Sequence, residues 1–269
     1  MAFGDISLTS SMRSVLVSLQ QNSSLLDRTS DRLATGKKVN TALDNPANFF
    51  AAKGHTDRAA RLENRKDGMN EAIQMIKAAD AGVKAITTMV ENLRGIINQA
   101  REAGGATAAQ TTQYAAVIAQ MDTIAQDSGY KGVNLLQAGT VTVQFDQDSS
   151  SNLTVTGTDS DSGGLSITQT LTTGASGSTL DTQETALNTA LNTLRDRSAD
   201  LASNLNILQT RVDFTTDMSN VLTAGANKLT AADTNEEGAN MLLLQTRQQL
   251  GTTSLSIASQ AAQSVLRLF

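Results

Sequence analysis

Residues 187–229 read LNTALNTLRDRSADLASNLNILQTRVDFTTDMSNVLTAGANKL, and the spacing of their apolar residues decides the fold. Apolar or small residues recur at alternating steps of three and four, the repeat of a helix with one apolar face. This stripe consists of Leu187, Leu191, Leu194, Ser198, Leu201, Leu205, Leu208, Val212, Thr215, Ser219, Leu222, Ala226 and Leu229. Asp181, with Glu184 three residues later, can cap the start of the helix. A helix of roughly 50 residues is about 75 Å long, so we expect an equally long partner.

A second stripe of the same kind follows Pro46, the only proline in the chain. Asn45 and Pro46 predict a helix start, with Asn45 as the N-cap and Pro46 at the first helical position. The stripe consists of Leu62, Met69, Ala72, Ile76, Ala79, Val83, Ile86, Val90, Leu93, Ile97 and Ala100. We expect this helix to run to the Gly104-Gly105 pair and to pack against the stripe of residues 187–229. A third helix, over about residues 107–128, should fold back antiparallel and carry Tyr114, Val117, Met121 and Ile124 on one face.

The middle of the chain, residues 139–177, changes to a period of two. The alternating apolar residues are Val141, Val143 and Phe145, then Leu153 and Val155, then Leu165 and Ile167. This pattern predicts short strands in β-hairpins, with exposed polar tips at residues 146–152 and 158–164. The fold class predicted from these patterns is mainly α, a long antiparallel helical bundle or coiled coil with a small β-hairpin region in the middle of the chain.

Both ends of the chain carry further helical stripes. The stripes consist of Met12, Val15, Leu19, Leu26 and Leu33 at the N-terminal end, and of Leu243, Leu250, Ile257, Val265 and Leu268 at the C-terminal end. Polar Asn22 and Thr29 fill two positions of the first stripe, and Thr234 with Glu237 predicts a capping box before the second. An isolated terminal helix is marginal in water, so we expect these to be self-assembly stripes that bury against other chains. The alternative is an ordinary intramolecular bundle in which the two ends pair only with each other.

Charge and composition argue against several other classes of protein. The formal net charge is −5, and phosphate contacts need clustered Lys and Arg, so we expect no nucleic-acid partner. No stretch approaches the roughly 20 apolar residues of a membrane span, and the N-terminal residues lack the apolar core of a cleavable signal peptide, so we expect no membrane partner. Cysteine is absent and His55 is the only histidine, with no nucleophile motif nearby. We therefore expect no enzyme, no cofactor and no metal site.

Segments near both ends resemble the signatures of one protein family. Residues 32–40 read RLATGKKVN and are followed by Asp44-Asn45-Pro46. Near the other end, residues 232–240 read ADTNEEGAN, residues 244–250 read LQTRQQL and residues 264–269 read SVLRLF. Together they resemble the N-terminal and C-terminal signatures of bacterial flagellins, especially the short alphaproteobacterial kind. The resemblance covers almost the whole chain.

The resemblance implies a structural subunit that polymerises into the bacterial flagellar filament for swimming motility. Residues 1–40 with 235–269 would form a terminal coiled-coil domain lining the filament core. Residues 41–234 would form a rod-like α-helical domain with β-hairpins at about 139–177. The resemblance also implies type III export, an extracellular location, and four kinds of partner: other copies of the chain, hook-filament junction proteins, a cap protein and an export chaperone.

Many flagellins present a patch to an innate-immune receptor, and the resemblance places the equivalent patch on the second helix and the helix after it. The patch consists of Asn92, Arg94, Gly95, Ile96 and Ala116. Only Arg94 and Ile96 keep the family's residue character, so we expect the patch to be largely lost and receptor activation to be weak or absent.

Two other functions stay open on the sequence. One is a hook-filament junction protein with the same terminal coiled coils, and the other is a type III secreted translocator or membrane-targeting helical module.

Overall fold

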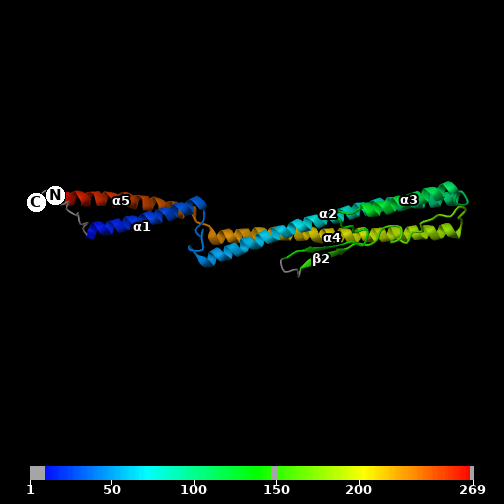
Figure 1. The fold of residues 1–269 in the computed structure, drawn as a ribbon, viewed down its shortest axis with the longest axis horizontal. Coiled ribbons are helices and arrows are strands. Elements are labelled where there is room, and N and C mark those ends of the chain that lie inside the picture. Colours follow the sequence, from blue (N-terminus) through cyan, green and yellow to red (C-terminus); the bar gives the residue numbers. More distant parts are fainter. Residues whose placement is uncertain (1–9, 147–150, 267–269) are drawn as a thin grey trace. The chain divides into compact units, whose positions relative to one another are not determined.

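The computed structural model describes residues 10–146 and 151–266, which fold mainly into helices (Figure 1). In chain order the elements are α1 (Ser10–Thr35), α2 (Pro46–Glu102), α3 (Ala108–Asp127), β1 (Thr140–Gln144), β2 (Asn152–Thr156), α4 (Ser178–Thr230) and α5 (Thr234–Leu266). The prediction of a mainly α fold with a small β region in the middle of the chain is confirmed.

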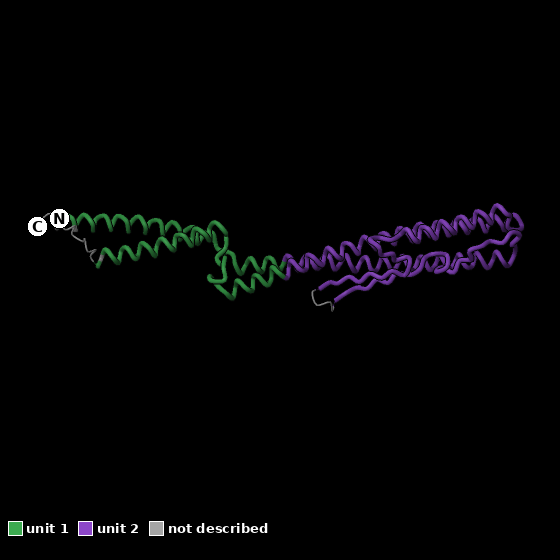
Figure 2. The backbone as a smooth tube through the Cα atoms, viewed as in Figure 1, with its two compact units in different colours: residues 1–57, 221–269 green, residues 58–220 purple. Residues whose placement is uncertain are grey.

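The chain divides into two compact units, which we describe separately (Figure 2). Unit 1 consists of Met1–Asp57 and Val221–Phe269, and unit 2 consists of Arg58–Asn220. Because α2 and α4 are long, each contributes to both units. The functional division predicted from the sequence has its boundaries near residues 40 and 235, at the breaks between helices. That division stays a prediction.

The core of unit 2 is built from the apolar stripes of α2 and α4. Every residue of the predicted α2 stripe is buried, from Leu62 to Ala100. On α4, Leu187, Leu194 and Leu208 are completely buried in the same core. The stripes contain only aliphatic residues, methionine and small residues, which suit a close helix-on-helix seam. Both long stripes therefore serve the packing that their spacing predicts.

Ion pairs at one end of unit 2 show that α2 and α4 run antiparallel. The guanidinium of Arg101, at the end of α2, lies 2.7 Å from a carboxylate oxygen of Asp181 and 2.6 Å from one of Glu184, both near the start of α4. The predicted start of this helix is wrong, since α4 begins three residues before Asp181, at Ser178. The Asp181 carboxylate pairs with Arg101 in place of capping the helix.

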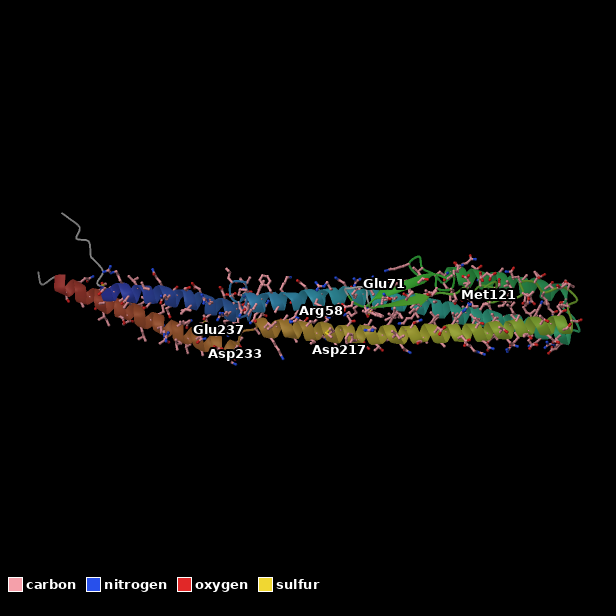
Figure 3. The ribbon with its side chains drawn as sticks, turned by 90° about the horizontal axis from the view of Figure 1, so that it is seen from below. Arg58, Glu71, Met121, Asp217, Asp233 and Glu237 are labelled. Atoms are coloured by element: carbon pink, nitrogen blue, oxygen red, sulfur yellow. The ribbon has the colours of Figure 1, made fainter. Side chains whose placement is uncertain are left out.

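The third helix, α3, lies in unit 2 and starts with a capping box that the sequence analysis did not predict. The backbone N–H of Gln110 donates to Thr107 Oγ1, and the N–H of Thr107 donates to Gln110 Oε1. Its buried residues are Tyr114, Ile118, Met121 and Ala125, with Met121 labelled in Figure 3. The predicted face is thus about half right, because Val117 and Ile124 are only partly buried at its edge. The neighbouring positions carry Ile118 and Ala125, which point into the core.

The middle of the chain contains one hairpin within the described residues. Strands β1 and β2 pair antiparallel, with Val141 opposite Val155 and Val143 opposite Leu153. Val143 and Val155 are buried, as is Phe145 directly after β1, whereas the threonines between them face solvent. The first predicted pair of strands is therefore confirmed.

The second predicted hairpin, at Leu165 and Ile167, is wrong. Ser166 between them has a φ of 56°, outside the strand region. The N–H of Leu165 donates to Asp161 O at 3.0 Å, and the N–H of Ile167 donates to Ser162 O at 2.9 Å, so the segment is a series of turns. Both apolar side chains are still buried, which explains why their spacing suggested a strand.

The predicted exposed tip at residues 158–164 is also wrong, because two of its serines are buried. Ser160 Oγ lies 2.7 Å from a guanidinium nitrogen of Arg197, and Ser162 Oγ donates to a carboxylate oxygen of Asp122 at 2.9 Å. Nearby, the Tyr114 hydroxyl donates to the carbonyl of residue 168 at 3.1 Å, and burial raises the pKa of Tyr114 to about 12. This turn segment is thus a layer of unit 2 that packs on α3 and α4.

Adjacent residues on α4 give a matched test of this core. Leu208 is completely buried, whereas Ile207 is 41% exposed. We expect Leu208→Ala to lower the free energy of unfolding by about 2–5 kcal/mol, because it removes buried methyl groups and leaves a cavity. Ile207→Ala should cost less than about 1 kcal/mol. Urea unfolding followed by circular dichroism measures both, and equal costs would contradict the assigned α4 face.

Candidate self-assembly interface

Helices α1 and α5 of unit 1 pack side by side in antiparallel orientation (Figure 1). Near the start of α5, a carboxylate oxygen of Glu237 lies 3.0 Å from the guanidinium of Arg32, which is near the end of α1. Farther along, the side chain of Leu19 on α1 lies against Gly251 on α5. The two ends of the chain therefore do pair with each other, as the intramolecular alternative expects.

The side chains of the N-terminal stripe are buried in this helix pair to different degrees. Met12 is buried, and Val15, Leu19 and Leu26 are half-buried. Leu33, the last of the stripe, is 37% exposed. The pair thus covers the stripe incompletely, and the cover weakens toward the end of α1.

The C-terminal stripe does not face α1. Leu243, Leu250 and Ile257 are 48%, 63% and 62% exposed, and the adjacent Leu242 is 68% exposed. The side chain of Val265 and all of Leu268 lie outside the described residues. Among the residues that the structure describes, this side of α5 is an apolar surface that no other element covers.

The α5 residues that do pack toward α1 lie one position farther along the chain. The buried or half-buried residues on that face include Glu237, Met241, Leu244, Gly251, Leu255 and Ala258. Several of them are small or charged, so the apolar pattern of the sequence favoured their larger neighbours. The signal that was available is spacing, because these residues also recur at steps of three and four.

Polar side chains make up much of the buried surface between α1 and α5. Asn22, Thr29 and Glu237 have exposed fractions of 8%, 7% and 6%. Asn22 Nδ2 donates to the carbonyl oxygen of Leu244 at 2.8 Å. The sequence predicts polar seam positions at Asn22 and Thr29, and both residues are buried as expected. The ion pair of Glu237 was missed, because this residue was assigned to a capping box.

The start of α5 is capped by the residue before the predicted one (Figure 3). Asp233 Oδ1 accepts hydrogen bonds from the N–H groups of Asn235 at 2.9 Å and Glu236 at 3.3 Å. The predicted capping box of Thr234 and Glu237 is therefore wrong. Since Asp233 satisfies these N–H groups, the carboxylate of Glu237 is free to reach Arg32.

The connections that follow α1 and precede α5 are hydrogen-bonded to each other. Gly36 ends α1 with a φ of 65°, a conformation that glycine adopts without strain. Its carbonyl accepts from the N–H of Ala232 at 3.0 Å, and the N–H of Lys38 donates to Thr230 O at 2.7 Å. These contacts hold the end of α1 beside the start of α5.

A groove with a volume of 430 Å³ lies along the α1 and α5 pair. Its lining mixes serine and glutamine with the apolar Val15, Leu19 and Leu25, and includes Arg247 and Gly251. Leu25 is 44% exposed. A two-helix pair therefore offers partly apolar surface in this groove as well as on the outer side of α5.

The residues of the predicted immune-receptor patch differ in their accessibility. Asn92, Arg94 and Ala116 are exposed, Gly95 is half-buried, and Ile96 is only 9% exposed. Ile96 belongs to the core of unit 2. Of the two residues expected to keep the family's character, only Arg94 is therefore presented to solvent.

Other kinds of site have little support in the part of the chain that the structure describes. No group of three or more histidine, aspartate or glutamate side chains there is placed to hold a metal ion. None of the described helices combines the length and the apolarity that a bilayer crossing requires. His55 is half-buried on α2. Among the described helices of unit 1, α5 presents four large apolar side chains that are 48% to 68% exposed.

Models of two protein families match this chain. The bacterial flagellin N-terminal helical region matches residues 6–142, and the bacterial flagellin C-terminal helical region matches residues 167–269. The first includes α1, α2 and α3, and the second includes α4 and α5. All five helices thus fall within the matched segments.

Individual flagellins also match. Flagellin FljM of Caulobacter vibrioides is 32% identical over 280 residues, which cover 100% of both chains. A flagellin of Brucella melitensis biotype 1 is 26% identical over 276 residues, which cover 97% of each chain. The crystal structure of Bacillus cereus flagellin matches with a TM-score of 0.47 and 24% identity, covering 55% of this chain and 88% of that one.

The loop after α1 provides a pH-dependent test of unit 1. A carboxylate oxygen of Asp44 accepts hydrogen bonds from the N–H groups of Thr41 at 2.9 Å and Asn40 at 3.1 Å. These backbone hydrogen bonds, that of Thr41 first, lower the pKa of Asp44. A lowered pKa in the folded state means that the carboxylate stabilises the loop above its unfolded pKa of about 3.9.

We expect this contribution to disappear as the pH falls through the lower pKa of the folded state. Carbon-detected NMR should show the Asp44 carboxyl titrating below the value of an unfolded peptide. The amide signals of Asn40 and Thr41 should shift with it, and Asp44→Asn should abolish that shift. Titration of Asp44 at or above about 3.9 would contradict the assigned hydrogen bonds.

Proposed function

This chain is a member of the bacterial flagellin family, and on that premise we propose that α1 and α5 provide the contacts through which it assembles. The chain is a structural subunit of the flagellar filament. Flagellins polymerise with copies of themselves, so each copy needs surfaces that are open in the single chain and covered in the filament.

The observation that carries the proposal is the uncovered stripe of Leu243, Leu250 and Ile257 on α5. These residues are seven positions apart, which places them on one line with steps of about 10.5 Å. Water-exposed apolar lines of this kind are costly for a monomer and typical of interaction surfaces. A neighbouring copy that covers them would gain roughly 1.5–3 kcal/mol for each side chain fully buried.

We further propose that residues 1–40 with 235–269 act as a terminal coiled-coil domain lining the filament core, and that residues 41–234 act as a rod-like domain. In support, α1 and α5 pair with each other, and the chain breaks after Thr35 and before Thr234 separate them from α2 and α4. The outer domains of longer flagellins have no counterpart among the described elements. The hairpin region is therefore the candidate for the exposed face of the rod.

The family also suggests where the chain works and what it meets. We propose an extracellular location, export through the type III apparatus, and contacts with hook-filament junction proteins, a cap protein and an export chaperone. The absence of cysteine supports export as an unfolded chain, because no disulfide has to form or break. We propose no catalytic activity.

Substitution of the α5 stripe tests the proposed assembly surface. We expect the triple variant Leu243→Ser, Leu250→Ser and Ile257→Ser to raise the critical concentration for filament growth by about a hundredfold or more, because three apolar contacts are lost. Sedimentation of filaments grown from seeds measures this concentration. The variant with Leu243→Met, Leu250→Met and Ile257→Leu keeps the stripe apolar and is the matched control.

The helix content of the unpolymerised triple variant should stay close to that of the unchanged protein, because the substituted side chains are exposed. An unaltered critical concentration in the serine variant would contradict the proposal. Failure of the unchanged protein to elongate at all would point instead to a hook-filament junction role.

The predicted loss of the immune-receptor patch leads to a separate test. We propose weak or absent receptor activation, because Ile96 is buried and Arg94 is the only exposed residue that keeps the family's character. Receptor-reporter cells treated with unpolymerised protein should respond far less than to an enterobacterial flagellin. A response of equal strength would overturn this expectation.

A further inference from the structure

The apolar repeat of α1 does not by itself determine how α1 and α5 align along their lengths. Leu19, Leu26 and Leu33 recur every seven residues. A sliding movement of one heptad, about 10.5 Å, would therefore replace one leucine by another. Some other contact has to make one alignment better than its neighbours.

Besides the backbone hydrogen bonds between the connections at the end of α1 and the start of α5, two side-chain contacts in unit 1 are specific to the observed alignment. One is the ion pair between Arg32 and Glu237, whose side chains are 26% and 7% exposed. The other is the packing of Leu19 against Gly251, where a Cβ atom on residue 251 would lie only 2.7 Å from Leu19 Cδ2. Neither contact has an equivalent one heptad away.

We propose that Arg32, Glu237 and Gly251 are positioning residues that fix the alignment of α1 and α5. This inference rests on the proposed assembly role of the same helices. Leu25 and Leu33 on α1 are 44% and 37% exposed, so the surface offered to another copy combines both helices. The alignment determines where the α5 stripe lies relative to these α1 side chains.

The consequences of a shift by one heptad follow from the antiparallel pairing. In one direction Glu237 would lie beside Leu25 in place of Arg32, and in the other it would lie past Thr35, where α1 has ended. A buried carboxylate without a cationic partner is strongly unfavourable. Leu19 would meet Leu244 or Ala258, which have the Cβ atom that Gly251 lacks.

Asn22 contributes less to this selection. Its amide donates to the backbone carbonyl of Leu244, and a shifted helix would offer another backbone carbonyl at a similar place. A buried asparagine in a helical seam usually specifies register, but Asn22 binds a main-chain carbonyl, a group that neighbouring positions of α5 also have. Among the side chains, the alignment thus depends mainly on the Arg32–Glu237 ion pair at one end and on the packing of Leu19 against Gly251 in the middle.

Double electron–electron resonance, which measures the distance between two spin labels, tests the inference on the full-length, unpolymerised chain. The protein has no cysteine, so Ser24→Cys and Gln260→Cys place one spin label each on exposed positions of α1 and α5. The unchanged background should give one main distance. A slip of one heptad changes the axial separation of the labels by about 10.5 Å, which such a measurement resolves.

Three variants separate alignment from general stability. Glu237→Arg places like charges together and should add a second distance population of at least about one tenth. The exchanged pair Arg32→Glu with Glu237→Arg should restore the single distance. Met12→Ala, which removes a buried side chain without touching either positioning contact, should leave the main distance unchanged.

Gly251→Leu provides an independent arm if Glu237→Arg unfolds the helix pair. Its side chain would occupy the space that Leu19 fills beside Gly251, so the main distance between the labels should also change. Retention of the single original distance in both Glu237→Arg and Gly251→Leu would overturn the inference, as would failure of the exchanged pair to rescue. Failure of the unchanged protein to form filaments would count against the proposed function and not against this alignment.

Discussion

A pair of helices can bury only one stripe of each helix, and this geometric limit governs both units of the chain. In unit 2 the stripes of α2 and α4 contribute to a largely aliphatic core. In unit 1 the stripes of α1 and α5 meet in a seam that contains Asn22, Thr29 and Glu237. The difference lies in what covers the remaining faces. In unit 2 other elements cover the helix pair, whereas unit 1 presents apolar surface that other copies can cover.

Unit 2 adds further layers to its helix pair. α3 buries Tyr114 and Met121 against it, the hairpin contributes Val143 and Val155, and the turns after β2 bury Leu165 and Ile167. Asp122 on α3 and Arg197 on α4 hold these turns in place through hydrogen bonds to the buried Ser162 and Ser160. The described residues of unit 1 provide no such layer over α5, so its outer leucines stay exposed. For a filament subunit, the neighbouring copies can supply the cover that is missing.

The sequence predicts the long-range packing well where large aliphatic residues mark the buried face. Every residue assigned to the α2 stripe is buried, because no other pattern of comparable size competes with it. The prediction failed where the buried face carries small or charged residues. Gly251 and Ala258 face α1, yet the adjacent Leu250 and Ile257 dominate the pattern.

Local patterns were ambiguous for a related reason. Leu165 and Ile167 are both buried, as a strand would bury them, but the positive φ of Ser166 turns the chain between them. Asp181 and Glu237 fit helix caps by spacing, but each pairs with a distant arginine. Contacts between residues far apart in sequence decide such cases, and a single sequence does not reveal them.

The most direct test of the proposed α5 assembly surface is an electron cryo-microscopy reconstruction of filaments grown from this protein. We expect Leu243, Leu250 and Ile257 to be buried against other copies in the filament, and a filament in which these side chains remain exposed to water would contradict their proposed role.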